Sequence, residues 1–361
     1  MQSLLSLRLE GEITAVSQLA TSPPNTPIGT PAPTPLSDPP TPLPRMSITV
    51  DGGSVELVPY FPGSGIRGRL RRMAEEVVRY GLAGEDGPSP FGVDDAYYLR
   101  NGGVKGSEKE DKADILGAQA RRDRNPLIGL FGAGAPWDKG RLNVGHARPT
   151  GPIRVDVVRG VRRDDFSGGG DALVALAPEG RTQWLEMSQR KALAARERQR
   201  QRDLEKAARR AKDPKDKKRL EDEAAALKSE IEKREAEAGV DVSVLMPLSG
   251  YEAIPAGTRL RHDFTLLRVN EHEVGLFLLA LDRLALSPII GAHGNHGCGI
   301  ISGTWRVRLR SGDLGRYEDI GELALKPFEG LDIPERLRGM DKSFDGPLRE
   351  GKFDFFAPKA A

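Results

Sequence analysis

The chain has 361 residues, enough for one elaborated domain or two ordinary ones, and 38% of them are hydrophobic, which is sufficient for a packed core. Its formal net charge is only +2, so a strongly basic surface must come from segregation of charge within the chain. The single cysteine, Cys298, excludes an internal disulfide and a cluster of thiolate metal ligands, and it suits a protein of the reducing cytoplasm.

The N-terminal part of the chain predicts short strands around a proline-rich loop. Residues 3–15 alternate polar and apolar side chains, as a half-buried strand does. Residues 21–45 hold ten of the 27 prolines and predict an extended loop without regular structure. Two strand-like runs follow within residues 47–63. We expect no signal peptide, because Arg8 interrupts the short apolar start, and no membrane span, because no window approaches roughly 18 apolar residues.

Residues 61–82, FPGSGIRGRLRRMAEEVVRYGL, predict a helix that begins after a glycine-hinged turn and is dense in arginine. Its apolar side chains recur at helical spacing and predict a buried face, formed by Ile66, Leu70, Met73 and Val77. Arginine in a first turn opposes the helix dipole, and the N–H groups of a PGSG turn favour an anion, phosphate in particular. The alternative is a solvated charged face.

The middle of the chain predicts small elements followed by a long helical hairpin. Residues 84–180 are rich in glycine and charge and predict short strands and helices. Residues 183–239 predict two helices folded back on each other, because Pro214 breaks an otherwise helical pattern. The charge is segregated, with 14 basic and 5 acidic side chains in residues 188–219 and 3 basic and 7 acidic ones in residues 220–238. Since apolar positions are sparse, we expect this hairpin to project from the core.

The C-terminal half predicts the remaining core elements. We expect strands at residues 242–248, 258–269 and 300–310, a helix at 271–286 and a glycine-rich loop, GAHGNHGCG, at 291–299. Apart from the long middle segment, the order is then strand, helix, strand, strand, helix, strand, which is the ferredoxin-like order.

We therefore predict an α+β fold with a ferredoxin-like (RRM-like) core that a large insertion splits. The predicted domains are the core at residues 1–82 and 240–317, an inserted subdomain at 83–182, the projecting helical hairpin at 183–239 and a tail at 318–361.

Three motifs occur in the same order as in a known family. Residues 62–72, PGSGIRGRLRR, resemble the P-G-S-S-[IL]-[KR]-G-x-[IL]-R pattern of the RAMP superfamily of CRISPR-associated proteins, with Gly65 in place of the second small polar residue. Residues 126–149 are similar to the family's L-F-G … L-x-V-x-D-A segment, with His146 where an aspartate is common. The loop at 291–299 is similar to the superfamily's glycine-rich loop. The long hairpin and the proline-rich loop resemble the type IV backbone subunit of the Cas seven branch most.

The resemblance implies a non-catalytic backbone subunit whose copies stack along a CRISPR guide RNA (crRNA) as a filament, with other effector subunits. Each copy would hold the RNA backbone and present bases to a complementary target nucleic acid, for which DNA is the favoured assignment. A guide varies in sequence, so the contacts should go to phosphates. No cofactor and no metal are implied. The residues expected to bind RNA are Ser64, Arg67, Arg69, Arg71, Arg72, Arg121, Arg122, Arg124, His293, Asn295 and His296.

The basic arm of the hairpin has two interpretations. It contacts nucleic acid or a neighbouring copy, or the hairpin is a self-paired, solvated coiled coil. The arginines expected at such a contact are Arg196, Arg198, Arg200, Arg202, Arg209 and Arg210.

Two further hypotheses stay open. The chain could be an RNA-processing endonuclease of the same superfamily that uses His293 or His296 as a general acid or base. Asp38 is the remaining catalytic candidate, because type III relatives cleave target RNA with an aspartate of the comparable loop and a metal ion. Asp38 has no acidic neighbour in its loop, however, and a single carboxylate is a poor metal site. The spacing of His293, His296 and Cys298 fits no common zinc pattern. Alternatively, the chain is an unrelated ferredoxin-like scaffold with a coiled-coil arm.

Overall fold

The computed structural model describes most of the chain, namely residues 4–21, 40–49, 53–84, 87–102, 115–134, 138–158, 178–210, 213–237, 250–312 and 314–357. The predicted strand at 242–248, most of the proline-rich loop and Asp38 lie outside the described residues. The chain divides into two compact units. One comprises Met1–Pro31, Asp38–Arg159 and Ser249–Ala361, and the other comprises Ala32–Ser37 and Gly160–Leu248.

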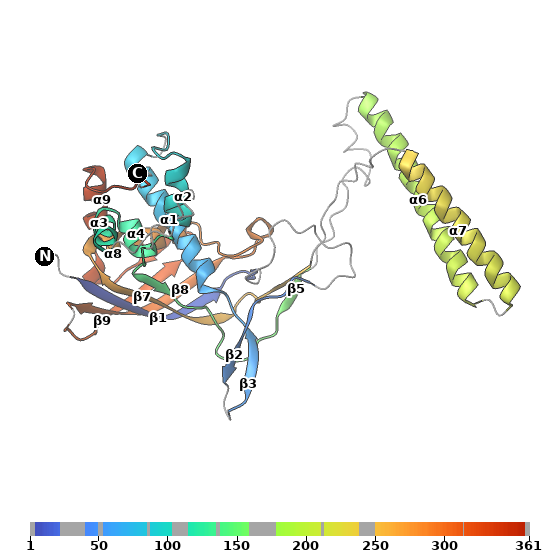
Figure 1. The fold of residues 1–361 in the computed structure, drawn as a ribbon. Helices are drawn as coiled ribbons and strands as arrows, with labels where there is room; N and C mark the ends of the chain where they lie inside the picture. The colour runs from blue at the N-terminus through green and yellow to red at the C-terminus, as the bar shows by residue number, and fades with distance from the viewer. Residues whose placement is uncertain are drawn as a thin grey trace. The chain divides into compact units, whose positions relative to one another are not determined.

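The first unit is built on an antiparallel sheet, in which six strands lie within the described residues (Figure 1). Their spatial order is β10 (Gly330–Asp332), β9 (Glu318–Lys326), β8 (Ile301–Ser311), β1 (Leu5–Ala15), β7 (Arg259–Val269) and β4 (Leu142–Val144). The alternation predicted for β1 is present, because Leu7 and Leu9 are fully buried while Arg8 between them is exposed. Leu9 pairs with Phe264 of β7 on one side and with Val307 of β8 on the other, so β1 is central.

Four of these strands and two helices follow the ferredoxin-like order. Along the chain they run β1, α1 (Gly63–Ala83), β4, β7, α8 (Glu271–Leu286) and β8, so the predicted α+β class is confirmed, and the sheet is antiparallel. The second strand position of the sheet is taken by β4, which comes from within the segment that the sequence assigned to an inserted subdomain. Its three residues are too few to show a periodic pattern.

α1 and α8 lie on one face of the sheet, and α9 (Met340–Arg349) packs against both (Figure 1). Ile66, Leu70 and Met73 of α1 are buried as predicted, whereas Val77 is only partly buried. Burial of each large apolar side chain stabilises the fold by about 1.5–3 kcal/mol. The fully buried aromatic side chains of this core include Phe61, Tyr98, Phe264, Phe277, Trp305, Phe344 and Phe355.

The tail at residues 318–361, for which the sequence predicted no core element, belongs to this core. It supplies the edge strands β9 and β10, the 3-10 helix η3 (Glu335–Leu337) and α9, whose Phe344 and Leu348 are buried. Glycines within the strands and Pro347 within the helix obscured these elements in the sequence.

The short helices α2 (Val93–Asn101), α3 (Ile115–Arg124) and α4 (Pro126–Phe131) lie beside α1 and α8. α4 begins at the N-cap Asn125, whose side chain accepts the N–H of Ile128 at 3.1 Å. Every residue of α4 is buried, which explains its apolar PLIGLF sequence.

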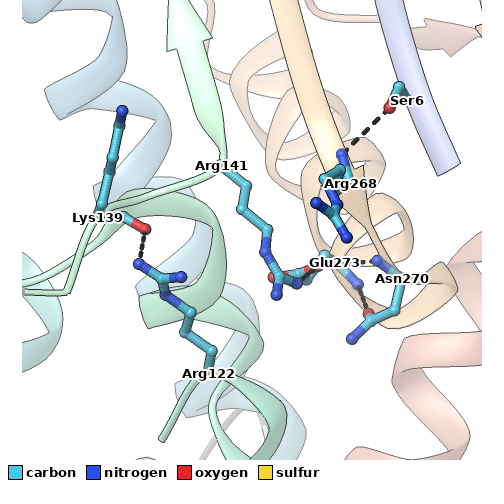
Figure 2. Close-up of polar contacts among 7 residues, drawn as sticks. All are labelled: Ser6, Arg122, Lys139, Arg141, Arg268, Asn270 and Glu273. Carbon is cyan, nitrogen blue, oxygen red and sulfur yellow. Dashed lines mark hydrogen bonds and ion pairs between the residues drawn. The ribbon is translucent and has the colours of Figure 1, made fainter. Parts of the chain in front are cut away.

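A buried ion pair ties the start of α8 to the segment before β4 (Figure 2). Asn270 and Glu273 form a capping box, in which each side chain accepts the other's backbone N–H at 2.9 Å. The Glu273 carboxylate also accepts from Arg141 at 2.7 Å and is fully buried. Figure 2 also shows the backbone N–H of Arg268 donating to Ser6 Oγ at 3.2 Å, a link between β7 and β1. These contacts join the segment before β4 to α8 and join β7 to β1.

Two two-stranded ladders complete the first unit. β2 (Arg45–Thr49) pairs with β3 (Val55–Pro59), and β5 (Asp156–Val158) pairs with β6 (Tyr251–Ala253). The 3-10 helix η2 (Gly294–His296) lies within the predicted glycine-rich loop.

The second unit is described over α6 (Pro178–Arg210) and α7 (Pro214–Glu237), which contact each other along their length (Figure 1). α7 begins at Pro214, where the sequence placed the break. Ala208, Ala224 and Ile231 are buried between the helices, and Arg200 lies 3.8 Å from Glu223. Small side chains at the contact therefore let the two helices approach closely.

Candidate nucleic-acid interface

The start of α1 is held by a segment that lies far away in the sequence. Pro62 is the N-cap and provides no capping side chain. Instead, the N–H of Gly63 donates to His146 Nδ1 at 3.0 Å, and the His146 ring lies 4.8 Å from the Tyr60 ring. A Cβ at position 63 would lie only 2.4 Å from the carbonyl oxygen of Val144, so only glycine fits there. The histidine found where the family commonly has aspartate thus serves as a helix cap.

The glycine-rich loop meets the first turn of α1 across the buried ring of Phe61. A Cβ at Gly65 would lie 3.2 Å from this ring, and a Cβ at Gly291 would lie 2.9 Å from it. The loop is also anchored to the segment that follows β1, since Ala292 N–H donates to Ala20 O at 2.8 Å. Two motifs separated by more than two hundred residues therefore form one surface.

Two histidines of this loop and Tyr251 of β6 form a stack of three rings. The Tyr251 ring of β6 lies parallel to the His293 ring, with centroids 3.8 Å apart and an interplanar angle of 8°. The His293 ring lies 5.6 Å from the His296 ring at 21°. Burial, and then the neighbouring His296, lowers the pKa of His293, so its ring is neutral at pH 7. Asn295 and His296 are exposed at the tip of the loop.

The arginines of α1 have different environments. Arg71 is buried and donates to the carbonyl oxygens of Leu99, Tyr98 and Gly132 at 2.5, 3.0 and 2.9 Å. Burial, and then the charge of Arg67, lowers the pKa of Arg71 to about 10, which still leaves it charged at pH 7. Although the sequence predicted an RNA contact for Arg71, the structure places its guanidinium inside, where it joins α1 to α2 and α4.

Arg67 and Arg69 are half-buried, and both have partners. The Arg67 guanidinium donates to the carbonyl oxygen of Phe131 and lies 5.8 Å from the centre of its ring. Arg69 donates to Ser287 Oγ at 3.1 Å, and its buried Nε finds no hydrogen-bond partner among the described residues. Burial lowers the pKa of both groups.

Ser64 in the first turn and Arg72 in the third turn of α1 are exposed polar side chains. After burial, the charge of Arg72 is the next largest cause that lowers the pKa of Arg69, so these two guanidinium groups repel each other. An anion beside them would relieve this repulsion. The surface formed by the first three turns of α1 and by residues 291–299 is called the α1–loop surface below.

The predicted basic run at residues 121–125 is largely structural. Arg121 donates two hydrogen bonds, of 2.9 and 3.1 Å, to the buried carboxylate of Asp138. Arg122 donates to the carbonyl oxygen of Lys139 at 2.5 Å (Figure 2), and Arg124 is exposed. Arg121 therefore satisfies a buried charge, which the sequence did not indicate.

The hairpin arginines belong to the second unit. The exposed ones are Arg196, Arg198, Arg200, Arg202 and Arg209, while the structure describes Arg210 only in its backbone. Arg196, Arg198, Arg200 and Arg202 occur at every second position and therefore alternate between opposite sides of α6. They do not form one continuous basic face on the described part of the helix.

The uncovered face of the sheet carries paired charges. Arg259 lies 2.5 Å from Glu12, Arg8 lies 2.8 Å from Glu10, and Arg306 pairs with Asp319. The outward side chains of β1, β7 and β8 include no aromatic ring among the residues that the structure describes. This face therefore lacks the rings on which RRM domains stack bases.

Sequence reasoning missed the connecting residues of the site. Tyr251, Phe61 and the capping role of His146 depend on long-range contacts, and no local pattern marks them. Within the described ranges, no three His, Cys, Asp or Glu side chains converge as metal ligands would. No helix there has the length and apolar character needed to cross a bilayer.

Comparison with known proteins places the chain in context. The family model described as "RAMP superfamily" matches residues 47–302, which is more than half of the chain. A solved structure described as "Type IV-B CRISPR Complex" is similar at 17% sequence identity and a TM-score of 0.40, over 82% of this chain and 90% of that chain. No curated protein gives a significant match.

Proposed function

Because this chain belongs to the RAMP superfamily, we propose that it is a non-catalytic backbone subunit of a CRISPR ribonucleoprotein effector. Several copies would line up along one crRNA in the cytoplasm, beside other effector subunits. Each copy would hold the sugar–phosphate backbone and leave the bases free to pair with a complementary target, DNA being the favoured one.

The observation that carries this proposal is the convergence of the start of α1 with the glycine-rich loop across Phe61. A helix N-terminus offers backbone N–H groups and a positive dipole end, both of which favour phosphate. Exposed Ser64 in the first turn and exposed Arg72 in the third turn add a hydroxyl and a guanidinium along the same helix. None of these groups reads a base, which suits a guide whose sequence varies.

The arginines divide into contact and support roles in this proposal. Arg72 and Ser64 contact phosphate directly, and Arg69 joins them when its unused Nε turns outward. Arg67 holds α4 and lines the contact from its half-buried position. Arg71 and Arg121 support the surface from inside and do not reach RNA.

A salt titration tests the proposal most simply. Binding of single-stranded RNA by the wild-type chain should weaken steeply with salt, because bound phosphates release counterions. Arg72→Ala should weaken binding at low salt and reduce the slope of log K against log salt by about 0.7, the value for one single-stranded phosphate contact. Arg336→Ala, at an exposed arginine on η3, is the matched control and should change neither quantity.

The proposal is wrong if the wild-type chain, freed of contaminants, does not bind RNA at low salt. It is also wrong if Arg72→Ala and Arg336→Ala lower the slope equally, because the contact would then be diffuse electrostatic attraction.

A further inference from the structure

The stacked rings of the glycine-rich loop are more than packing requires. Tyr251 is buried, His293 is half-buried and His296 is exposed, so the stack leads from the interior to the surface. Its inner end is fixed, because the Tyr251 hydroxyl lies 3.4 Å from the sulfur of buried Cys298. The outer end presents an aromatic ring to solvent.

The backbone holds this stack in place at a conformational cost. His293 has φ 59° and ψ 28°, in the left-handed region that non-glycine residues seldom adopt. Its carbonyl oxygen accepts from His296 N–H at 2.8 Å and from Cys298 N–H at 3.3 Å. The loop contains several glycines that could have occupied this conformation without strain, yet a ring is found at this position.

We propose that Tyr251, His293 and His296 form a stacking platform for one unpaired nucleobase of a single-stranded RNA, with the base lying on the exposed ring of His296. The inference rests on the proposed function and adds a base contact to its phosphate contacts. Stacking on an aromatic ring is tolerant of base identity, which again suits a variable guide.

The chemistry of the surroundings favours a base as the occupant. The α1–loop surface already offers groups for phosphate, so a nucleotide bound there carries its base within reach of the same loop. The uncovered sheet face lacks outward aromatic rings among its described residues, so it cannot stack bases in the manner of an RRM. The neutral His293 ring adds no charge repulsion to the stack.

A pair of probes separates stacking from charge. One is an unstructured oligouridylate, and the other is an abasic oligomer with the same number of phosphates. His296→Ala should weaken binding of the oligouridylate about 5- to 30-fold, within the range expected for one stacked base. The same change should leave binding of the abasic oligomer unaltered, because the phosphate contacts remain.

Two more variants and a control complete the design. His296→Phe keeps an aromatic ring and should restore oligouridylate binding to within about 3-fold of wild type. His293→Gly suits the left-handed backbone, so the loop keeps its path while the stack loses its middle ring, and the affinity should fall as in His296→Ala. Tyr97→Ala removes an aromatic side chain of α2 that is 55% exposed and should have no effect.

The outcomes are distinct. If wild type binds the oligouridylate and His296→Ala binds it equally well, the platform is refuted and the proposed function stands. If His296→Ala weakens both probes alike, or if His296→Phe fails to restore binding, the histidine acts through charge or hydrogen bonding and the platform is refuted. If wild type binds neither probe, both the platform and the proposed function are refuted.

Discussion

Alanine at Arg71 should mainly lower the stability of the fold, whereas alanine at the neighbouring Arg72 should mainly lower the affinity for RNA. Arg71→Ala removes a buried charged donor from the carbonyl oxygens of Leu99 and Gly132, which lie 2.5 and 2.9 Å from it. The other two acceptors of Arg71 keep a donor, because Tyr98 O accepts the N–H of Gly102 at 3.0 Å and Phe131 O accepts from Arg67. Two carbonyls would therefore be left unsatisfied, at about 1–3 kcal/mol each.

We expect Arg71→Ala to lower the free energy of unfolding by about 3–5 kcal/mol, a large part of the roughly 5–15 kcal/mol typical of a domain. Arg71→Lys keeps the charge but not the planar fork of donors, so it should lower the same quantity by about 2 kcal/mol. Arg72→Ala, at an exposed site, should stay within about 0.5 kcal/mol of wild type.

The assay is urea denaturation of RNA-free protein, followed by tryptophan fluorescence, which reports on buried Trp305. RNA must be removed first, since a ligand that binds only the folded state would stabilise all variants. The reasoning is refuted if Arg71→Ala is as stable as wild type while its RNA affinity falls as in Arg72→Ala. Arg71 would then face the RNA.

Three further outcomes follow from the same contacts. Gly63→Ala should lower the melting temperature and RNA affinity together, because its Cβ would lie 2.4 Å from Val144 O, and unchanged melting would contradict the described close approach. Burial lowers the pKa of His262 to about 3, below its unfolded value, so the unfolded chain binds more protons as pH falls from about 6.5 to 3 and the free energy of unfolding should drop, by about 2 kcal/mol at pH 5. His262→Gln should make the free energy of unfolding depend less on pH in this range. An equal pH dependence in wild type and His262→Gln would show that other groups cause it. Incubation of guide-bound protein with complementary RNA and Mg²⁺ should leave the RNA intact, and cleavage that Asp38→Ala or His296→Ala abolishes would show that the chain is an enzyme.

Local sequence patterns were enough to predict the helices and strands that have strong hydrophobic periodicity. β1, α1, α8 and the two helices of the hairpin follow directly from alternation, from 3.6-residue spacing and from Pro214. β4 was not found as a core strand, because three residues hold no period and its place is set by pairing with β7. The strands of the tail were not predicted for a related reason, since they contain glycine and depend on pairing, β9 with β8 and β10 with β9.

The candidate site was predictable in its motifs and not in its contacts. The PGSG turn and the glycine-rich loop stand out as sequences, but only the fold brings them together on Phe61. The local sequence does not show that the Arg71 guanidinium is buried and the Arg72 guanidinium exposed. Arg71 is buried by its contacts with the ends of α2 and α4, which are distant in the sequence. The same holds for Arg121, whose partner Asp138 follows it by 17 residues.

The number of protein copies bound per RNA, measured by native mass spectrometry as a function of RNA length, tests the central claim most directly. A backbone subunit should add one copy for each fixed increment of nucleotides, at any RNA sequence, until the strand is covered. A chain that binds as a single copy at every length would contradict the account, since it would then be a processing enzyme or an unrelated scaffold.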